Sequence, residues 1–294
     1  MIAVTDAPGA VRQLVGSSRP LSWINTAYPF AAAYLLADGG ITLALVLGTV
    51  FFLVPYNLLM YGINDVFDHE SDLRNARKGG VEGIVLDRRW HALTLWSAGL
   101  LALPFVVALV VLGSVASTLV LAVVLAAVVG YSAPGIRLKE RPVLDSLTSS
   151  THFVGPAAVG LALSGAPLGV TAFAALAAFF LWGMASHAFG AVQDIVPDRE
   201  ARIGSIATEL GARTTVRLAI ALYLAAGLTM LLTGWPAALA GLLVIPYVAS
   251  IWGYRSLPDA HGDRAHPGWR RFLVLNLLTG FLLTQLLIWI VVRG

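Results

Sequence analysis

The sequence predicts an all-α, polytopic membrane protein, a bundle of about nine transmembrane helices, and three observations lead to this fold class. Apolar residues make up 58% of the 294 residues and charged residues only 12%, whereas a soluble domain carries roughly 25% charged residues. The mean hydropathy is +0.81. The apolar residues also occur in stretches of about 20, the length that crosses a bilayer core as a helix.

The apolar stretches follow one another with very short turns and longer, charged connections in alternation. Residues 1–18 lack the apolar centre of a signal peptide, so we expect the first span to direct insertion. Residues 1–20 are predicted to form a cytoplasmic N-terminal segment and residues 21–294 a single transmembrane domain. The expected spans are 21–38, 41–62, 92–112, 115–133, 143–164, 169–190, 214–233, 236–254 and 271–292.

The basic residues predict the orientation in the cell membrane. Of the 19 Lys and Arg residues, all but Arg293 lie in the N-terminal segment, in the longer connections or at the helix ends beside them. The positive-inside rule then places the N-terminus and the charged loops in the cytoplasm and the C-terminus outside. The net charge of +3 does not indicate a nucleic-acid partner, because these residues lie in short loops between spans that contact the lipid bilayer. The absence of cysteine excludes disulfides, thiolate catalysis and Cys-ligated metals.

Two acidic stretches, residues 64–72 and 193–198, each follow directly on a long apolar span. Carboxylates three and four residues apart share a helix face, where they would repel one another unless a cation neutralised them. Oxygen-only ligands suit Mg²⁺, which binds through a few carboxylates and bridges to substrate phosphates. A single loop aspartate mostly solubilises a helix end, but two clusters after matching helices favour a metal site. The predicted ligands are Asp65, Asp68, Asp72, Asp194 and Asp198.

The second and sixth spans form a weak internal repeat, since each ends in an amide followed by an aspartate. A parallel repeat of this kind would bring both acidic segments over one central cavity at the cytoplasmic face. The amides, Asn64 and Gln193, either bind a metal or phosphate oxygen or cap a helix end. His69 and Glu70 are expected to face water.

The pattern Asn-Asp-x-x-Asp-x-x-x-Asp from Asn64, together with Asp-x-x-x-Asp from Asp194, resembles the UbiA superfamily of intramembrane prenyltransferases. The resemblance covers nearly the whole chain, and it implies that the aspartates hold Mg²⁺, two ions being expected, against an allylic isoprenoid diphosphate. Residues 131–139 are similar to a Tyr-Ser…Arg-x-Lys stretch of the family. The catalytic residues so implied are Tyr131, Arg137 and Lys139, and Arg74 and Lys78 are weaker phosphate-binding candidates.

The expected reaction follows from charge. Metal ions and basic side chains neutralise the leaving diphosphate, the allylic C–O bond ionises, and the cation is attacked by an acceptor in an apolar cavity. His187 lies within an apolar span seven residues before Asp194. It either contacts substrate and accepts a proton from a cationic intermediate, or is a neutral hydrogen-bonded residue of the bundle. The predicted substrate-binding residues are Asn64, Arg74, Lys78, Gln193 and His187.

Three strings, residues 61–68, 74–83 and 186–194, look most like the lycopene elongase branch. That branch adds C5 units from dimethylallyl diphosphate to lycopene, giving C45 and C50 carotenoids, and implies coupling to a downstream carotenoid cyclase. The alternative acceptor is a quinone precursor, a hydroxybenzoate or naphthoate. A cation transporter is a more distant alternative, because it predicts charges buried in mid-helix rather than at helix ends. A CDP-alcohol phosphotransferase is disfavoured because its Asp-Gly-x-x-Ala-Arg signature is absent.

Overall fold

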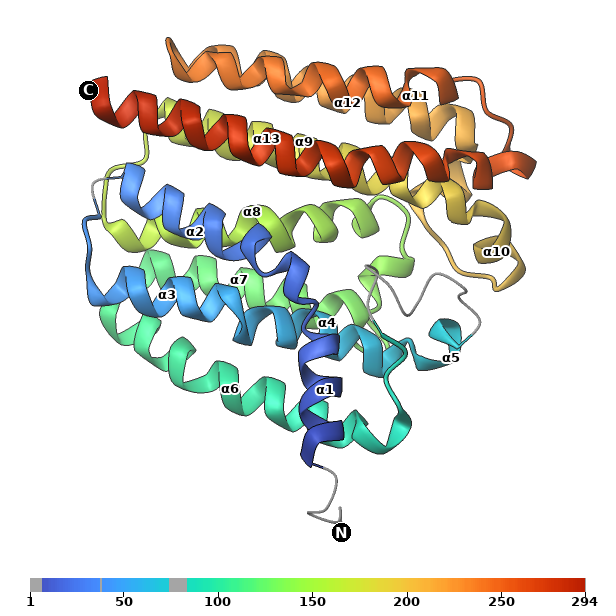
Figure 1. Cartoon of the computed structure of the whole chain (residues 1–294), viewed down its shortest axis with the longest axis horizontal. Helices are drawn as coiled ribbons and strands as arrows, with labels where there is room; N and C mark the ends of the chain where they lie inside the picture. Colours follow the sequence, from blue (N-terminus) through green and yellow to red (C-terminus); the bar gives the residue numbers. More distant parts are fainter. Residues whose placement is uncertain (1–6, 38, 74–83, 294) are drawn as a thin grey trace. The chain divides into compact units, whose positions relative to one another are not determined.

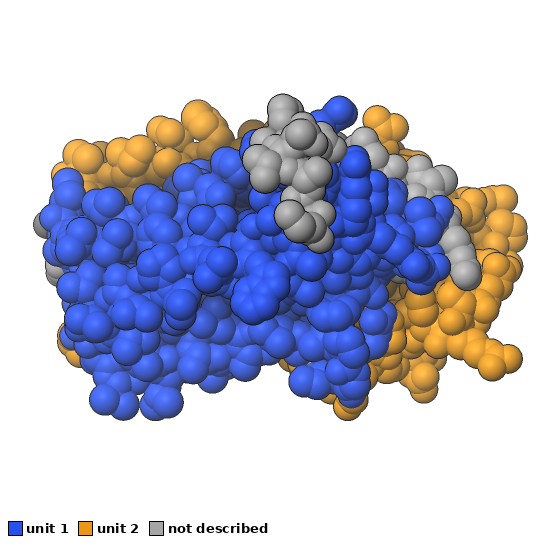
Figure 2. Space-filling model, turned by 90° about the horizontal axis from the view of Figure 1, so that it is seen from below, with its two compact units in different colours: residues 1–137, 155–166 blue, residues 138–154, 167–294 orange. Residues whose placement is uncertain are grey.

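The computed structural model describes residues 7–37, 39–73 and 84–293, and all regular structure in these residues is helical (Figure 1). This confirms the predicted all-α class. The chain divides into two compact units, which Figure 2 distinguishes by colour. Unit 1 comprises residues 1–137 and 155–166, and unit 2 comprises residues 138–154 and 167–294. The prediction of a single domain over residues 21–294 stays a prediction.

The helices of unit 1 begin where the sequence supplies start signals. Thr42 accepts a hydrogen bond from the Leu45 N–H at 3.2 Å, Pro55 opens a helix in its first turn, and Ser114 forms a capping box with Ser117. The helices are α1 (Ala7–Ser17), α2 (Ile24–Leu36), α3 (Leu43–Leu53), α4 (Pro55–Phe67), α5 (His69–Asp72), α6 (His91–Leu112), α7 (Val115–Ser132) and the second half of α8 (Leu144–Ser164).

An aromatic cluster forms the core of unit 1. Phe30 of α2, Phe52 of α3 and Tyr56 of α4 are fully buried, with ring centroids 5.1 Å apart for Phe30–Phe52 and 5.0 Å for Phe52–Tyr56. Gly48 permits the close approach of α2 and α3, because a Cβ at this position would collide with the Phe30 ring. The cluster fixes α4, and α4 carries the first acidic motif at its C-terminal end.

The helices of unit 2 include two short segments that carry the second acidic motif. A capping box formed by Ser205 and Thr208 starts α11, and Gly211, with φ of 75°, interrupts it. Besides the first half of α8, the main helices of unit 2 are η4 (Leu138–Glu140), α9 (Val170–Ala191), η5 (Val192–Asp194), α10 (Ile195–Glu200), α11 (Ile206–Thr229), η7 (Ala237–Leu243), α12 (Val244–Ile251), η9 (Asp259–Ala265) and α13 (His266–Arg293).

Small residues and one polar contact hold the helices of unit 2 together. Ala185 of α9 and Ala212 and Ala219 of α11 are fully buried in one hydrophobic cluster, because small side chains let membrane helices approach closely. The Tyr247 hydroxyl of α12 donates to Asn276 Oδ1 of α13 at 2.9 Å. This packing positions α9, whose C-terminal end leads directly into the second motif.

Seven helical segments of the described residues are long and apolar enough to cross a bilayer. Many of their large apolar side chains face outward, as lipid contact requires. The protein is therefore a multi-pass membrane protein, while the count of nine spans and the orientation of the termini stay predictions. The seven segments are Leu43–Phe67, Arg88–Leu112, Val115–Ser132, Val170–Glu200, Ile206–Thr233, Ala237–Tyr254 and Asp259–Arg293.

Candidate active site

The first motif begins in the last turn of α4 with a fully buried carboxylate, Asp65. Its Oδ2 accepts a hydrogen bond from Ser17 Oγ at 2.8 Å, and its Oδ1 forms an ion pair with Arg19 Nη2 at 3.1 Å. Both carboxylate oxygens are thus engaged by the segment that precedes the first predicted span. Asp65 therefore links the N-terminal segment to the motif helix, and its predicted role as a metal ligand stays a prediction.

Arg19 is a site residue that sequence reasoning missed. Its guanidinium lies 4.1 Å from the centroid of the Tyr61 ring, one turn before Asp65 on α4. Its backbone has φ of 51°, in the left-handed region, and it directly precedes the short 3-10 turn that begins at Pro20. The sequence offered only positive-inside charge at this position, and no spacing relates residue 19 to residue 65.

Asp68 follows α4 directly and forms an ion pair with a predicted catalytic residue. Arg137 Nη2 lies 3.4 Å from Asp68 Oδ1, and Nη1 lies 3.5 Å from the Phe67 carbonyl oxygen. Arg137 reaches this position through a tight loop, in which Gly135 and Arg137 both have positive φ, 85° and 39°. The structure therefore brings two of the predicted site residues, Asp68 and Arg137, together within unit 1.

Asn64 and Asp72 complete the oxygen donors at this end of unit 1. Asn64 Oδ1 accepts a hydrogen bond from Ser132 Oγ, the residue after Tyr131, at 2.9 Å. Asp72 is only 7% exposed and lies one turn beyond Asp68, whose carbonyl accepts the Asp72 N–H at 2.8 Å. Carboxylate and amide oxygens with no nitrogen or sulfur donor fit Mg²⁺. Among the described residues, however, no three His, Asp or Glu side chains come together as a ready metal site.

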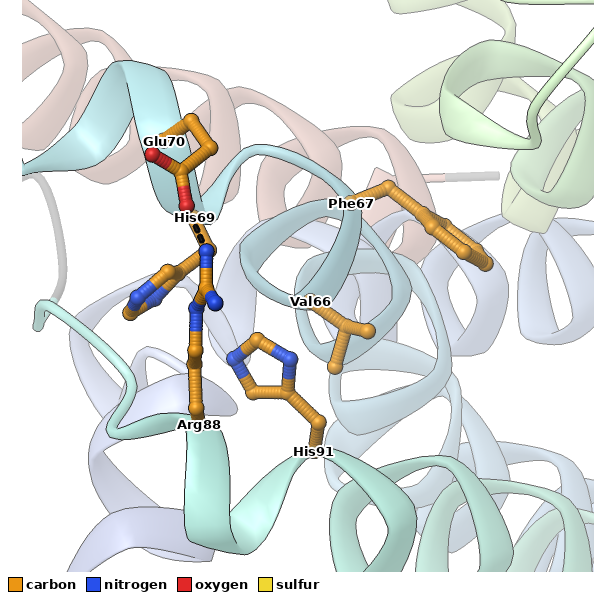
Figure 3. A pocket seen from close by; sticks show the side chains of 6 residues that line it. All are labelled: Val66, Phe67, His69, Glu70, Arg88 and His91. Atoms are coloured by element: carbon orange, nitrogen blue, oxygen red, sulfur yellow. Dashed lines mark hydrogen bonds and ion pairs between the residues drawn. The ribbon is translucent and has the colours of Figure 1, made fainter.

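His69 and Glu70, which lie between Asp68 and Asp72, help to line a cavity of about 410 Å³ (Figure 3). His69 Nδ1 lies 2.9 Å from the Leu86 carbonyl oxygen, and its ring packs edge-on against His91 with centroids 4.9 Å apart. His69 is half-buried by the segment before α6, so the expectation that it faces water is met only in part. Glu70 is exposed, as expected, and pairs with exposed Arg88. Arg74 and Lys78 lie outside the described residues.

The second motif occupies η5 and α10 of unit 2. Asp194 and Asp198 are both partly exposed. Gln193 Nε2 donates to the Gly190 carbonyl at 3.1 Å, and its Oε1 lies 2.8 Å from His266 Nδ1. The Gln193 amide thus closes the end of α9 and connects it to the start of α13.

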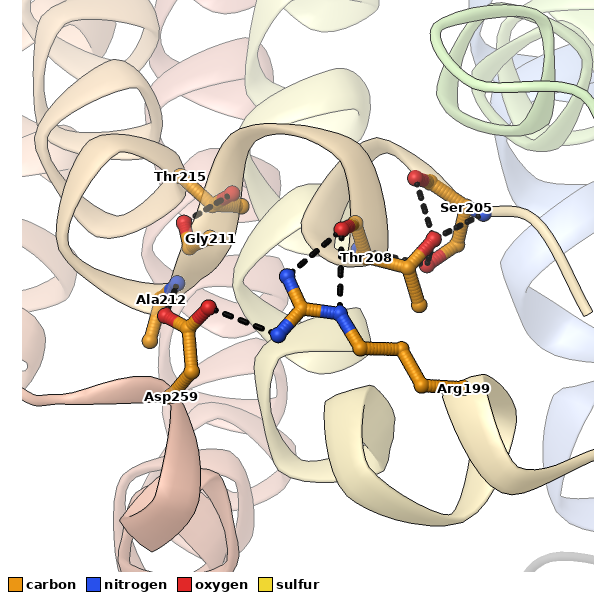
Figure 4. A network of polar contacts seen from close by, with 7 residues as sticks. All are labelled: Arg199, Ser205, Thr208, Gly211, Ala212, Thr215 and Asp259. Atoms are coloured by element: carbon orange, nitrogen blue, oxygen red, sulfur yellow. Dashed lines mark hydrogen bonds and ion pairs between the residues drawn. The ribbon is translucent and has the colours of Figure 1, made fainter. Parts of the chain in front are cut away.

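Arg199, next to Asp198, anchors α10 (Figure 4). Its Nε and Nη2 donate to the Thr208 carbonyl at 3.2 and 2.7 Å, and its Nη1 pairs with Asp259 Oδ2 at 2.8 Å. Asp259 Oδ1 accepts the Ala212 N–H at 2.7 Å, just after the break at Gly211. Asp259 therefore caps the second part of α11 and holds the anchor of the second motif.

Three further predicted residues lie on α7, η4 and α9. His187 of α9 is partly exposed, and its Nδ1 lies 3.0 Å from Ser146 Oγ of α8. Lys139 lies in η4 and is partly exposed, and Tyr131 occupies the last turn of α7. The described contacts thus join two residues of the segment 131–139 to the first motif: Ser132 contacts Asn64, and Arg137 contacts Asp68. The meeting of the two motifs over one cavity, and the roles of all predicted site residues, stay predictions.

Comparisons with known proteins agree with this fold. The model of the UbiA prenyltransferase family matches residues 26–278. The chain is 56% identical over 283 residues to a C(50) beta-cyclic carotenoids biosynthesis protein of Dietzia sp., covering 96% of this chain and 66% of that protein. It is 49% identical over 278 residues to a lycopene elongase/hydratase of Corynebacterium glutamicum, covering 95% of this chain and 97% of that protein.

Solved structures show the same fold at low sequence identity. A UbiA homologue from Archaeoglobus fulgidus, bound to DMAPP and Mg²⁺, has a TM-score of 0.67 and 17% identity, covering 91% of this chain and 98% of that one. A UbiA homologue from Aeropyrum pernix has a TM-score of 0.64 and 20% identity, covering 88% and 98%. With the two aspartate motifs at the ends of their helices and the family match across most of its length, this chain belongs to the UbiA prenyltransferase family.

Proposed function

We propose that this enzyme transfers a dimethylallyl group from its diphosphate to lycopene, in a Mg²⁺-dependent reaction that gives C45 and C50 carotenoids. The observation that carries the proposal is the near full-length similarity to the Corynebacterium protein named lycopene elongase/hydratase. A second support is the set of oxygen donors beside a guanidinium at the end of α4. That combination suits a divalent cation and a diphosphate bound side by side.

The residues that would hold the metal are the oxygen donors of the two motifs. In unit 1 these are Asn64, Asp65, Asp68 and Asp72, and in unit 2 they are Asp194 and Asp198. Bound Mg²⁺ would neutralise charge on the diphosphate and make it a better leaving group. Ser17 and Arg19 would hold the Asp65 carboxylate in position for this role.

The basic residues of the loop after α7 would bind the departing diphosphate. Arg137 offers a planar fork of N–H donors, and Lys139 offers a compact positive charge. Arg137 already lies within 3.4 Å of Asp68, so a diphosphate bound beside this pair would meet a guanidinium next to a proposed metal ligand. Charge developing on the leaving group is thereby stabilised, and the allylic C–O bond breaks heterolytically.

The acceptor in this proposal is an alkene, which requires no deprotonation before it attacks. The π electrons of a terminal double bond of lycopene form the new C–C bond with the allylic carbon. The product is a tertiary cation, which the apolar surroundings keep from bulk water. Loss of a proton gives an elongated alkene, and capture of water gives an alcohol. Either product is a substrate that a downstream carotenoid cyclase could take up.

Expression in a lycopene-accumulating bacterial host, followed by mass spectrometry of extracted carotenoids, tests this function. We expect lycopene masses increased by one and two C5H8 units, with or without added water. The matched control is the Asp68→Ala variant at the same level of membrane-inserted protein. Unchanged lycopene with correctly inserted protein would contradict the acceptor, and hydroxybenzoate and naphthoate with labelled allylic diphosphates would then be assayed.

A further inference from the structure

Two loops of unit 2 that belong to different parts of the predicted site lie against each other. The Lys139 loop, residues 138–143, contains η4 and leads into α8. The second-motif loop, residues 201–205, follows α10 and ends at Ser205, whose capping box with Thr208 starts α11 (Figure 4). The contacts between the two loops fix how closely the backbone around Lys139 approaches the segment that follows the second motif.

Gly204 of the second-motif loop is where the two backbones come closest. A Cβ at this position would come within 2.6 Å of the Glu140 carbonyl oxygen and within 3.4 Å of the Pro142 side chain. Gly204 has no positive φ, so the structure needs its missing side chain rather than its conformational freedom. The obstacle is a backbone atom of the residue next to Lys139, so a larger residue at 204 must displace one of the two loops.

Asp145, in the first turn of α8, ties the start of α11 to the Lys139 loop. Its carboxylate is fully buried, Oδ1 accepts the Ser146 N–H at 2.8 Å, and Oδ2 accepts the Ile206 N–H, the first of α11, at 2.8 Å. The Asp145 N–H in turn donates to the Arg141 carbonyl at 2.9 Å. A buried backbone donor that loses its acceptor is costly, so this one carboxylate keeps both segments in register.

Backbone hydrogen bonds connect the second-motif loop to the motif itself. The Ile203 N–H donates to the Asp198 carbonyl at 2.8 Å, and the Arg202 N–H donates to the Arg199 carbonyl at 3.1 Å. Arg202 has φ of 57°, which turns the chain sharply after α10. A displacement at Gly204 is therefore passed to the backbone of Asp198 through a short, hydrogen-bonded turn.

We propose that Gly204 and Asp145 are positioning residues of the diphosphate site, which together hold the Lys139 loop at a fixed distance from the second motif. The inference rests on the proposed function, in which Lys139 binds the diphosphate and Asp198 holds a metal ion. One diphosphate can contact an ammonium group and a metal ion at once only if their separation matches its length, because charge-assisted contacts are short. A change in the distance between the two loops therefore weakens the grip on the diphosphate.

The test measures the Kd of inorganic diphosphate, with Mg²⁺ present, for the purified full-length protein in detergent, by isothermal titration calorimetry. Lys139→Ala should raise this Kd at least about tenfold, because a charge-assisted contact is lost. Gly204→Ala should raise the Kd about fivefold in the wild-type background but less than about twofold in the Lys139→Ala background, because it acts through Lys139. A residue with only a structural role would raise the Kd by the same factor in both backgrounds.

A matched glycine and a second variant complete the experiment. Gly253→Ala is the control and should keep the wild-type Kd, because a Cβ there meets no atom within 4 Å and Gly253 also has no positive φ. Asp145→Asn has nearly the same shape but a single acceptor oxygen, so one of its two backbone donors is left unpaired. Its Kd should rise about threefold, again only where Lys139 is present. If Gly204→Ala does not accumulate in the membrane, Asp145→Asn decides.

The outcomes separate this inference from the proposed function, because binding of diphosphate needs no acceptor. Coupling of Gly204 to Lys139 without elongation of lycopene keeps the inference and overturns the acceptor. Equal factors in the two backgrounds, or an unchanged Kd in both Gly204→Ala and Asp145→Asn, overturn the positioning role even where lycopene is elongated. An unchanged Kd in Lys139→Ala overturns it as well, and wild-type protein that binds no diphosphate overturns both.

Discussion

The two acidic motifs are held in place in different ways. In unit 1 the motif itself contributes to the packing, because its first carboxylate, Asp65, is fully buried against Ser17 and Arg19. In unit 2 the residues beside the motif hold its segment against neighbouring helices. Gln193 contacts His266, and Arg199 contacts Asp259, while Asp194 and Asp198 stay partly exposed.

The difference indicates how structural and chemical roles are shared. A buried carboxylate with its own cation cannot be removed without leaving the cation unpaired, so Asp65 combines stability with position. Where neighbouring residues anchor the segment, an aspartate can change without loss of the fold. Substitutions should therefore affect stability and activity together at the first motif's start, and mainly activity at the partly exposed aspartates of the second motif.

The largest expected effect comes from the proposed metal ligands. Asp68→Ala and Asp194→Ala should each reduce carotenoid elongation by at least about 100-fold, because charge on the leaving diphosphate is no longer neutralised. Chelation of divalent cations in membrane preparations should have the same effect, and added Mg²⁺ should reverse it. The control is Glu70→Ala, an exposed carboxylate between Asp68 and Asp72, which should keep near wild-type activity. Equal activity of all three variants would refute the two-motif site.

The second effect concerns the buried ion pair of the first motif. Arg19→Met leaves the Asp65 carboxylate without its cation, and we expect a loss of about 3 kcal/mol in the free energy of unfolding. In detergent this should lower the melting temperature by roughly 5–10 °C. The double variant Arg19→Met/Asp65→Asn should recover more than half of the loss, because no unpaired charge then remains buried. Losses that simply add in the double variant would show that the pair is not coupled.

A smaller effect is expected at the anchor of the second motif. Asp259→Ala removes the acceptor for the Ala212 N–H and the partner of Arg199, so α10 loses one of its fixed contacts. Elongation should fall about 3- to 10-fold, and the melting temperature should fall by only about 2–4 °C, because the exposed pair is screened and the lost cap costs about 1 kcal/mol. Asp263→Ala, an exposed aspartate of the same segment η9, is the control. If both variants behave alike, Asp259 does not position the motif.

The smallest effect is expected for the exposed pair of Arg88 and Glu70, whose side chains are 69% and 64% exposed. Arg88→Gln should change the free energy of unfolding by less than about 0.5 kcal/mol, because exposed ion pairs are largely screened. Thermal unfolding in parallel with Arg19→Met gives the contrast directly. A loss as large as that of Arg19→Met would show that burial does not explain the difference between the two pairs.

The sequence was sufficient for the fold class and the two motifs, because both depend on local patterns. Apolar runs of membrane-spanning length predict helices, and aspartates spaced three and four residues apart at their ends predict a metal-binding face. The resemblance of residues 131–139 also singled out Arg137, which the structure shows 3.4 Å from Asp68, while its role in binding diphosphate stays a prediction. These inferences need only the order of residues along the chain.

Only the tertiary structure decided which side chains serve as partners. The ion pair of Arg19 with Asp65 joins residues 46 positions apart, and Asp259 reaches Ala212 across 47. The contact of Ser146 with His187 spans 41 positions and two helices. Such contacts depend on how helices pack, and packing is determined by the volume of many side chains at once rather than by any local spacing. The sequence by itself thus determined where the carboxylates lie along the chain, and the packing of the helices determined which side chains they contact.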